Sequence, residues 1–257
     1  MEFIRLLEKS KEETYSKICV GLDLAIYGSR DKYTMDENQD KTSTLLSLIT
    51  DLSDHCCAFK INRQYILDLT FNDIKQVTAK AHEFKRPIII DHKLSDIGST
   101  NQQALFHMKQ EGFDALTASP FPGNVQEVCS DGHNYDLAVI ILALMSNPDA
   151  IWMKNSSFET VPIFQHHCRL ANKYADGIVV GATGHVTEKD LAIIREEMSD
   201  KVILSPGIGA QGGNIHHVLS YFEKDVIFNV GRGVIYQKSP KNALEEYNQQ
   251  IQKLLGK

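Results

Sequence analysis

Two lysines and two aspartates stand at the ends of apolar runs, in an order that alternates positive and negative charge. Residues 87–90 are apolar and lead directly into Asp91, Lys93 and Asp96, while Lys60 ends another apolar run. Because side chains alternate along a strand, we expect Asp91 and Lys93 to point to the same side. Buried charges are costly unless they are paired, so a structural ion-pair network is one interpretation. Charges gathered at one end of a sheet are more typical of a catalytic centre, which is the interpretation that we favour.

Two glycine-rich turns indicate a second kind of site. They are Gly207-Ile208-Gly209 and Gly231-Arg232-Gly233, and each lies between a predicted strand and a predicted helix. Glycine lets backbone N–H groups approach an anion, and Arg232 adds a forked cationic donor. Single glycine turns are often only tight loops. Two of them after the last two strands, together with an arginine, predict a phosphate site.

Short apolar runs alternate with longer amphipathic segments along the whole chain, which is the period of βα units. We predict eight strands, at residues 18–24, 58–62, 87–94, 115–119, 137–144, 177–181, 202–205 and 226–230. The predicted helices include residues 43–54, 72–84, 99–112, 158–174, 187–198, 213–222 and 240–255. Eight such strands predict a (β/α)8 TIM barrel, and the absence of a linker or composition break predicts one domain over residues 1–257.

Barrels of this kind carry their chemistry at the C-terminal ends of the strands, where the charged residues and glycine turns fall. The polar segment at residues 27–42 is predicted to be a loop after the first strand. It either covers the site or is a solvated insertion.

Composition excludes several classes of protein. The 257 residues are 42% hydrophobic and 23% charged, which is ordinary for a globular chain with one sizeable core. A net charge of −6 disfavours a nucleic-acid-binding face. Apolar runs such as residues 137–145 are shorter than the roughly 18 residues that a membrane span needs. The five cysteines are odd in number and lack CxxC spacing, and no secretory signal begins the chain, so we expect reduced thiols and a cytoplasmic protein.

Asp91-His92-Lys93-Leu94-Ser95-Asp96-Ile97-Gly98-Ser99-Thr100 matches a D-x-K-x-x-D-I-x-x-T signature and resembles the orotidine 5′-monophosphate decarboxylase family. Other segments of the chain, before and after this one, match that family in order and spacing. They are Gly21-Leu22-Asp23, Phe59-Lys60-Ile61-Asn62, Ser205-Pro206-Gly207-Ile208-Gly209-Ala210-Gln211-Gly212-Gly213 and Val230-Gly231-Arg232-Gly233. The resemblance implies a decarboxylase without cofactor that converts orotidine monophosphate to uridine monophosphate in pyrimidine synthesis. It also implies a homodimer with shared active sites.

The resemblance assigns a role to each matching residue. Lys60, Asp91, Lys93 and Asp96 would form a charge network, and Asp96 with Thr100 would reach into the site of the partner subunit. Asp23 and Asn62 would face the ribose, Ser146 would contact the pyrimidine, Gln211 would bridge phosphate and base, and the phosphate would lie against Gly209, Gly231, Arg232 and Gly233.

The reaction explains why charged residues would be needed. Loss of CO2 from C6 of the pyrimidine leaves an in-plane carbanion that no neighbouring carbonyl can delocalise. Lys93 would place positive charge beside C6 and then deliver a proton. Asp91 would lie near the substrate carboxylate, where two like charges about 4 Å apart repel by roughly 4 kcal/mol at an effective dielectric of 20. Enzymes supply about 8–23 kcal/mol, so repulsion alone is not the mechanism.

Two alternatives stay open. Sugar-phosphate decarboxylases and aldolases of the same superfamily share D-x-K-x-x-D but use magnesium, with a glutamate ligand at the second strand end. This chain has Lys60 there, where a divalent cation needs an oxygen ligand, so we predict no metal. The other alternative is a barrel that binds nucleotides without catalysis, of which the loss of Lys60, Asp91 or Lys93 would be the marker.

Overall fold

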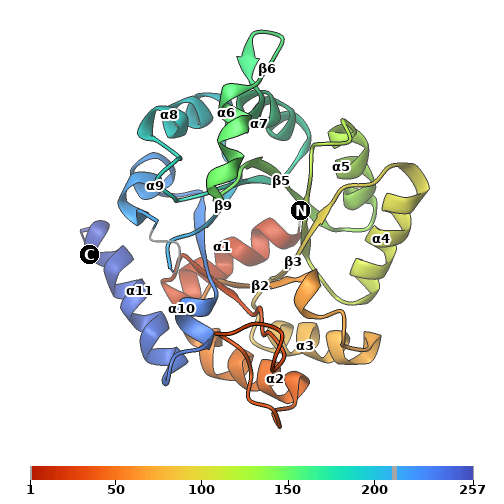
Figure 1. Ribbon diagram of the computed structural model, residues 1–257, viewed down its shortest axis with the longest axis vertical. Coiled ribbons are helices and arrows are strands. Elements are labelled where there is room, and N and C mark those ends of the chain that lie inside the picture. The colour runs from red at the N-terminus through yellow and green to blue at the C-terminus, as the bar shows by residue number, and fades with distance from the viewer. Residues whose placement is uncertain (1, 210–212, 257) are drawn as a thin grey trace.

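The computed structural model describes residues 2–209 and 213–256, and its centre is a closed barrel of eight parallel strands (Figure 1). The strands, in the order in which they pair around the barrel, are β1 (Ile18–Gly21), β2 (Ala58–Asn62), β3 (Ile88–Leu94), β4 (Ala115–Ala118), β5 (Ala138–Leu144), β8 (Gly177–Val180), β9 (Val202–Pro206) and β10 (Val226–Val230). Pairing of β10 with β1 closes the barrel. The predicted (β/α)8 TIM barrel is confirmed, and each strand lies within three residues of its predicted bounds.

Helices surround the barrel and bury one face each against it (Figure 1). They are α2 (Lys41–Leu52), α3 (Phe71–Glu83), α4 (Gly98–Gln110), α5 (Val125–Asn134), α7 (Ile163–Tyr174), α8 (Glu188–Glu197), α9 (Ile215–Phe222) and α11 (Pro240–Leu254). Short turns of helix are η1 (Ser53–His55), η2 (Arg63–Tyr65), η3 (Pro148–Ile151), α6 (Trp152–Asn155) and α10 (Arg232–Ile235). Reciprocal capping boxes begin α3 and α8, because Thr70 pairs with Asp73 and Thr187 with Asp190.

The prediction of one helix over residues 158–174 is wrong in its first part. A small antiparallel hairpin, β6 (Ser157–Phe158) with β7 (Val161–Pro162), precedes α7. Glu159 and Thr160 both have positive φ, at 46° and 74°, which suits a two-residue hairpin turn. Neither residue is a glycine or asparagine, so the sequence carries no usual sign of that turn.

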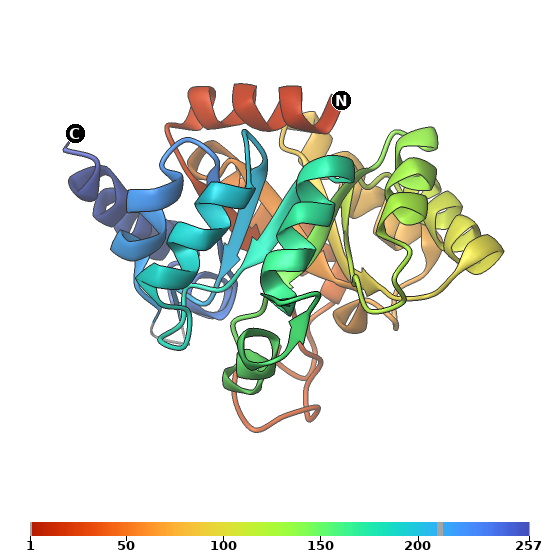
Figure 2. The same ribbon diagram turned by 90° about the horizontal axis from the view of Figure 1, so that it is seen from above.

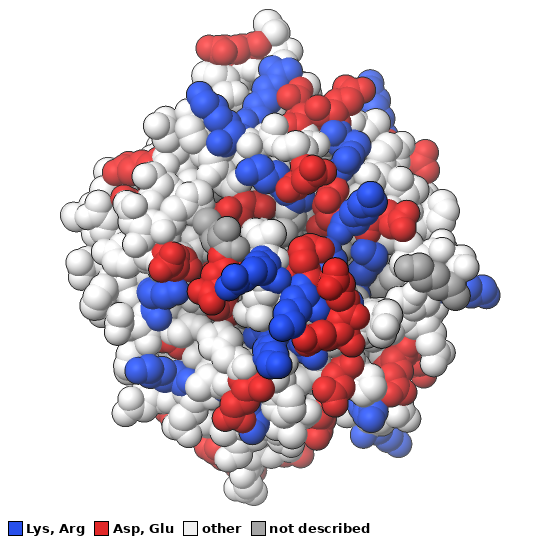
Figure 3. Space-filling model, turned by 180° about the vertical axis from the view of Figure 1, so that it is seen from behind, with Lys and Arg blue, Asp and Glu red and all other residues white. Residues whose placement is uncertain are grey.

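Helix α1 (Glu2–Thr14) was not predicted, and it lies across the end of the barrel opposite the projecting loops (Figure 2). Phe3 and Leu7 are buried against residues near the N-terminal ends of the strands, including Cys19 and Ala58. This helix therefore closes the bottom of the barrel. Figure 3 shows that lysine and arginine are intermixed with aspartate and glutamate on this face, so that charge of neither sign dominates it.

The opposite end of the barrel carries two projecting segments (Figure 2). One is the chain between β1 and α2, and the other contains α6 and β6. The loop predicted at residues 27–42 lies in the first of these segments except for its last two residues, which begin α2. Both segments follow C-terminal ends of strands, so the site predicted at those ends lies on this side. No helix in the two described stretches of the chain is long and apolar enough to cross a bilayer.

Candidate functional site

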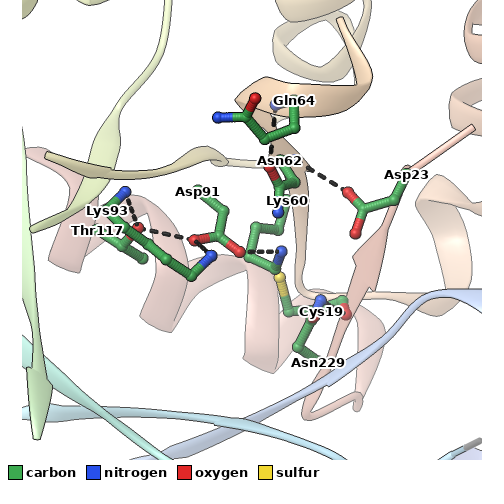
Figure 4. A network of polar contacts seen from close by, with 9 residues as sticks. All are labelled: Cys19, Asp23, Lys60, Asn62, Gln64, Asp91, Lys93, Thr117 and Asn229. Carbon is green, nitrogen blue, oxygen red and sulfur yellow. Dashed lines mark hydrogen bonds and ion pairs between the residues drawn. The ribbon is translucent and has the colours of Figure 1, made fainter. Parts of the chain in front are cut away.

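One carboxylate joins two lysines at the C-terminal ends of β2 and β3 (Figure 4). Asp91 Oδ2 lies 2.8 Å from Lys60 Nζ, and Asp91 Oδ1 lies 2.8 Å from Lys93 Nζ. The side chain of Lys60 is 5% exposed, that of Asp91 13% and that of Lys93 37%. The network thus runs from a buried ammonium group to one that reaches the open end of the barrel.

The charged groups of this network keep one another ionised. Burial by itself would lower the pKa of Lys60, but the negative charges of Asp23 and Asp91 outweigh burial and raise that pKa above its ordinary value. Burial would raise the pKa of Asp91, but the charges of Lys60 and Lys93 and their hydrogen bonds hold it well below its usual range. Asp91 is therefore a carboxylate, and Lys60 an ammonium, throughout the neutral pH range.

A bulge in β3 sets the direction of Lys93. Ile90 pairs with Leu116 and Leu94 pairs with Ala118, so that three residues of β3 lie opposite the single Thr117 of β4. Lys93 has φ 54°, a backbone conformation that costs a residue with a side chain of the order of 1–3 kcal/mol. Regular strand alternation predicts that Asp91 and Lys93 lie on one side. They do share a side, but on a distorted strand, and such bulges are common beside active sites.

Asp23 and Asn62 form the edge of the network towards β1. Asp23 follows β1, and its Oδ1 accepts the backbone N–H of Asn62 at 2.9 Å. The side-chain Oδ1 of Asn62 accepts the N–H of Gln64 at 3.0 Å and so caps the turn η2. Both side chains are held by backbone N–H groups at the end of β2 and in the turn that follows it (Figure 4).

A cavity of about 140 Å³ continues from Asp23 to the glycine turns. Its lining residues are Asp23, Tyr65, Pro206, Gly207, Gly209, Asn229, Val230, Gly231, Arg232 and Gly233. The structure thus brings together one predicted ribose ligand and four of the predicted phosphate ligands.

Different constraints favour glycine at different positions of this cavity. Gly207 has φ 107°, a conformation that side chains disfavour. A Cβ on Gly233 would lie 2.6 Å from Tyr247 Oη, and a Cβ on Gly209 would lie 3.2 Å from the same atom. Tyr247 of α11 therefore leaves no room for a side chain at Gly233 unless it moves, and it leaves little room at Gly209. The lack of side chains also keeps the backbone of both turns accessible to an anion.

Arg30 and Tyr33 of the loop after β1 contact Tyr65 and Arg232, which line the cavity; these two residues were not singled out in the sequence. Arg30 Nη1 donates to Tyr65 Oη at 3.1 Å, and the Arg30 guanidinium lies 5.5 Å from the centre of the Tyr65 ring. The guanidinium of Arg232 lies 5.8 Å from the centre of the Tyr33 ring, within reach of a cation–π interaction. The loop therefore covers the cavity edge. Aromatic residues beside an arginine were the available signal in the sequence.

Three predicted site residues, Asp96, Thr100 and Ser146, are not brought into this cluster. Asp96 and Thr100 are exposed at the start of α4, and within residues 2–209 and 213–256 no ion pair joins Asp96 to Lys93. Asp96 is fixed through its carbonyl oxygen, which accepts hydrogen bonds from Asn101 and Asn124. Ser146 is buried after β5, and its carbonyl oxygen accepts from Thr183 at 2.7 Å. Gln211 lies outside the described residues.

Comparison with known proteins gives a consistent result. The model of the Orotidine 5′-phosphate decarboxylase / HUMPS family matches residues 16–247. A protein of Thermomicrobium roseum named orotidine 5′-phosphate decarboxylase is 29% identical over 262 residues, covering 92% of this chain and 87% of the relative. A protein of Janthinobacterium with the same name is 30% identical over 259 residues, covering 93% of this chain and 91% of the relative.

A solved structure shares the fold. The structure of UMP synthase from Leishmania donovani matches with a TM-score of 0.84 at 24% identity. The match covers 98% of this chain and 56% of that chain, so this chain corresponds to about half of the larger protein.

Proposed function

Because the chain belongs to the Orotidine 5′-phosphate decarboxylase / HUMPS family, we propose that it converts orotidine 5′-monophosphate to uridine 5′-monophosphate and CO2. It is accordingly a carboxy-lyase of pyrimidine biosynthesis, as the names of its curated relatives indicate. The observation that carries the proposal is the network of Lys60, Asp91 and Lys93, set beside a cavity that ends at Arg232. A cationic phosphate end and a charged reacting end are what an anionic nucleotide with a leaving carboxylate requires.

The substrate would span this cavity. Its phosphate would lie against Arg232 and the glycine turns, and its ribose beside Asp23. This places the pyrimidine towards Lys93, since the network lies beyond Asp23 on β2 and β3. Contacts to the remote phosphate supply binding energy that orients the base without taking part in the bond that breaks.

Lys93 would act on the reacting carbon. The bond between C6 and the carboxylate breaks, CO2 leaves, and the electron pair stays on C6. The Lys93 ammonium stabilises that developing charge and transfers its proton to C6, after which solvent restores the proton on Lys93. Its side chain is 37% exposed in the described chain, so exchange with solvent is open before the substrate binds.

Asp91 would face the substrate carboxylate and repel it. A carboxylate in that place stays charged only if cations hold its pKa down, which is the part that Lys60 and Lys93 play. Lys60 also supports a reaction without metal, because an ammonium group occupies the strand end where magnesium would need an oxygen ligand.

We propose in addition that the sites are shared in a homodimer. Asp96 and Thr100 are exposed, and the neighbouring Ile97 is 62% exposed. The segment after β4 contacts Asp96 through Asn124 and carries Phe121, which is 86% exposed. A second copy covering this surface would bury apolar area and bring its Asp96 towards Lys93. The five cysteines are free and buried, which fits a reducing compartment such as the cytoplasm.

Product analysis tests the proposed reaction. Purified protein is incubated with orotidine monophosphate, and the nucleotides are separated by ion-exchange chromatography. We expect conversion to uridine monophosphate by the wild type and no conversion by Lys93→Ala, which removes both the cation and the proton donor. Retention of the fold is checked by circular dichroism. Conversion by Lys93→Ala at the wild-type rate would reject the role of this lysine.

A further inference from the structure

Thr117 is a buried residue of β4 that connects the two groups proposed to act on the substrate. Its hydroxyl oxygen accepts the backbone N–H of Lys93 at 3.0 Å, and its hydroxyl hydrogen is donated to Asp91 Oδ1 at 2.8 Å (Figure 4). Only 1% of the residue is exposed, so water does not replace either bond. One hydroxyl thus ties the backbone of the lysine to the side chain of the aspartate.

The bulge in β3 explains why this hydroxyl is needed. Three residues of β3 face Thr117 alone, which takes the Lys93 N–H out of the regular ladder between β3 and β4. A buried N–H without an acceptor is unfavourable, and Thr117 Oγ1 supplies the acceptor. Lys93 therefore keeps its left-handed backbone, with φ 54°, because this side chain completes its hydrogen bonding.

The second bond of the hydroxyl acts on Asp91. Asp91 Oδ1 accepts from Lys93 Nζ as well as from Thr117. When Lys93 gives its proton to C6, it ceases to be a cationic donor, whereas a threonine hydroxyl does not titrate in this pH range. Thr117 thus keeps its hydrogen bond to Asp91 Oδ1 during the step in which Lys93, the other donor to that oxygen, loses its charge.

We propose that Thr117 is a positioning residue, which fixes the backbone of Lys93 and the carboxylate of Asp91 in their reactive arrangement. The proposal rests on the decarboxylase function proposed above. It does not place Thr117 in contact with the substrate. It predicts that the hydroxyl affects turnover more than substrate binding.

Two substitutions separate the hydroxyl from the shape of the side chain. Thr117→Val keeps the branched shape and removes the hydroxyl, while Thr117→Ser keeps the hydroxyl. Thr78→Val is a matched control, because Thr78 is also 1% exposed and its hydroxyl donates to Glu111 O at 2.6 Å, away from the cavity. Steady-state decarboxylation of orotidine monophosphate gives kcat and KM for each protein.

We expect Thr117→Val to lower kcat by ten- to a hundredfold with KM within about twofold of wild type, which corresponds to about 1.4–2.7 kcal/mol of lost transition-state stabilisation. Thr117→Ser should retain kcat within about threefold, and Thr78→Val should leave kcat unchanged. A kcat within twofold of wild type for Thr117→Val would overturn the proposal, as would equal losses in the serine and valine variants. If Thr117→Val does not fold, Thr117→Cys replaces it, with a kcat at least fivefold below that of Thr117→Ser expected and an equal kcat contradicting the proposal.

A crystal structure of Thr117→Val keeps this inference separate from the proposed function. We expect the Lys93 backbone to leave the left-handed region and the contact between Lys93 Nζ and Asp91 to lengthen. An unchanged Lys93 conformation would overturn the positioning role whatever the substrate is. A wild-type protein that is inactive on orotidine monophosphate would instead refute the proposed function.

Discussion

Asp91→Asn removes one negative charge from between two lysines and leaves the shape of the side chain nearly unchanged. Lys60 and Lys93 each lose an ion pair of 2.8 Å. The consequences differ because the Lys60 side chain is 5% exposed and that of Lys93 is 37% exposed. Lys93 can turn towards water, whereas Lys60 stays buried with its ammonium facing an amide.

The expected cost follows from this difference in burial. Removal of one partner from a buried ion pair costs about 3–5 kcal/mol, whereas an exposed pair contributes about 0–1 kcal/mol. Lys60 belongs to the first class, and the more exposed Lys93 is close to the second. Asp23 still opposes part of the Lys60 charge, so we expect Asp91→Asn to lower the free energy of unfolding by about 3 kcal/mol, out of a typical total of about 5–15 kcal/mol.

Urea unfolding at pH 7.5, followed by circular dichroism, measures this loss. The matched control is Lys93→Met, which leaves Asp91 paired with Lys60 and should cost about 1 kcal/mol or less. In the double variant Lys60→Met/Asp91→Asn no buried ammonium is left unpaired, so it should be more stable than Asp91→Asn by at least about 1 kcal/mol. Asp91→Asn protein as stable as wild type, or a double variant less stable than the single one, would refute this reasoning.

Three further predictions concern Arg232, the assembly and a half-buried histidine. Arg232→Ala should mainly raise KM, because it removes a hydrogen bond to a charged group that contributes roughly 1.5–3 kcal/mol to binding. The increase in KM should be smaller for the nucleoside orotidine. Equal effects on both substrates in steady-state assays would show that Arg232 does not contact phosphate. The Lys93→Ala and Asp96→Ala proteins should each be inactive, and a mixture of the two under conditions of subunit exchange should recover up to about a quarter of wild-type activity. The reason is that half of randomly formed dimers are hybrids, and each hybrid has one intact site. No recovery, in a mixture where mass spectrometry verifies the hybrids, would mean that Asp96 serves its own subunit. Burial lowers the pKa of His167 to about 4, so the unfolded chain takes up a proton near pH 6.5 that the folded chain refuses. The contribution of His167 to the free energy of unfolding is therefore fully present above pH 6.5, and it should fall by about 2 kcal/mol when the pH is lowered to 4.5. Urea unfolding of His167→Gln at both pH values should show a loss smaller by that amount, and an equal loss in both proteins would contradict the assignment.

Much of the site was predictable because its residues stand where apolar runs end. Lys60, Asp91 and Lys93 lie in the C-terminal parts of strands whose burial the sequence shows plainly, and parallel strands bring their C-terminal ends together. Arg232 and its glycines follow other strands of the same barrel and line one cavity for the same reason.

The rest depends on contacts that a local pattern does not contain. The bulge of β3 arises from pairing with β4, so nothing in residues 91–93 alone shows that Lys93 adopts positive φ or that Thr117 completes its hydrogen bonding. The docking of Arg30 is likewise a contact between distant segments. In the proposed homodimer, Asp96 would approach Lys93 of a second copy of the chain, a contact that the sequence and structure of one chain do not contain.

Decarboxylation of orotidine monophosphate by this chain should need no metal ion, and a spectrophotometric assay shows whether it does. Purified protein is treated with a chelator, dialysed and mixed with orotidine monophosphate, and the absorbance of the orotate chromophore is followed. We expect an absorbance loss to completion at a rate that is proportional to enzyme concentration and unchanged by added magnesium. No absorbance change, or a change that appears only after magnesium is added, would contradict it.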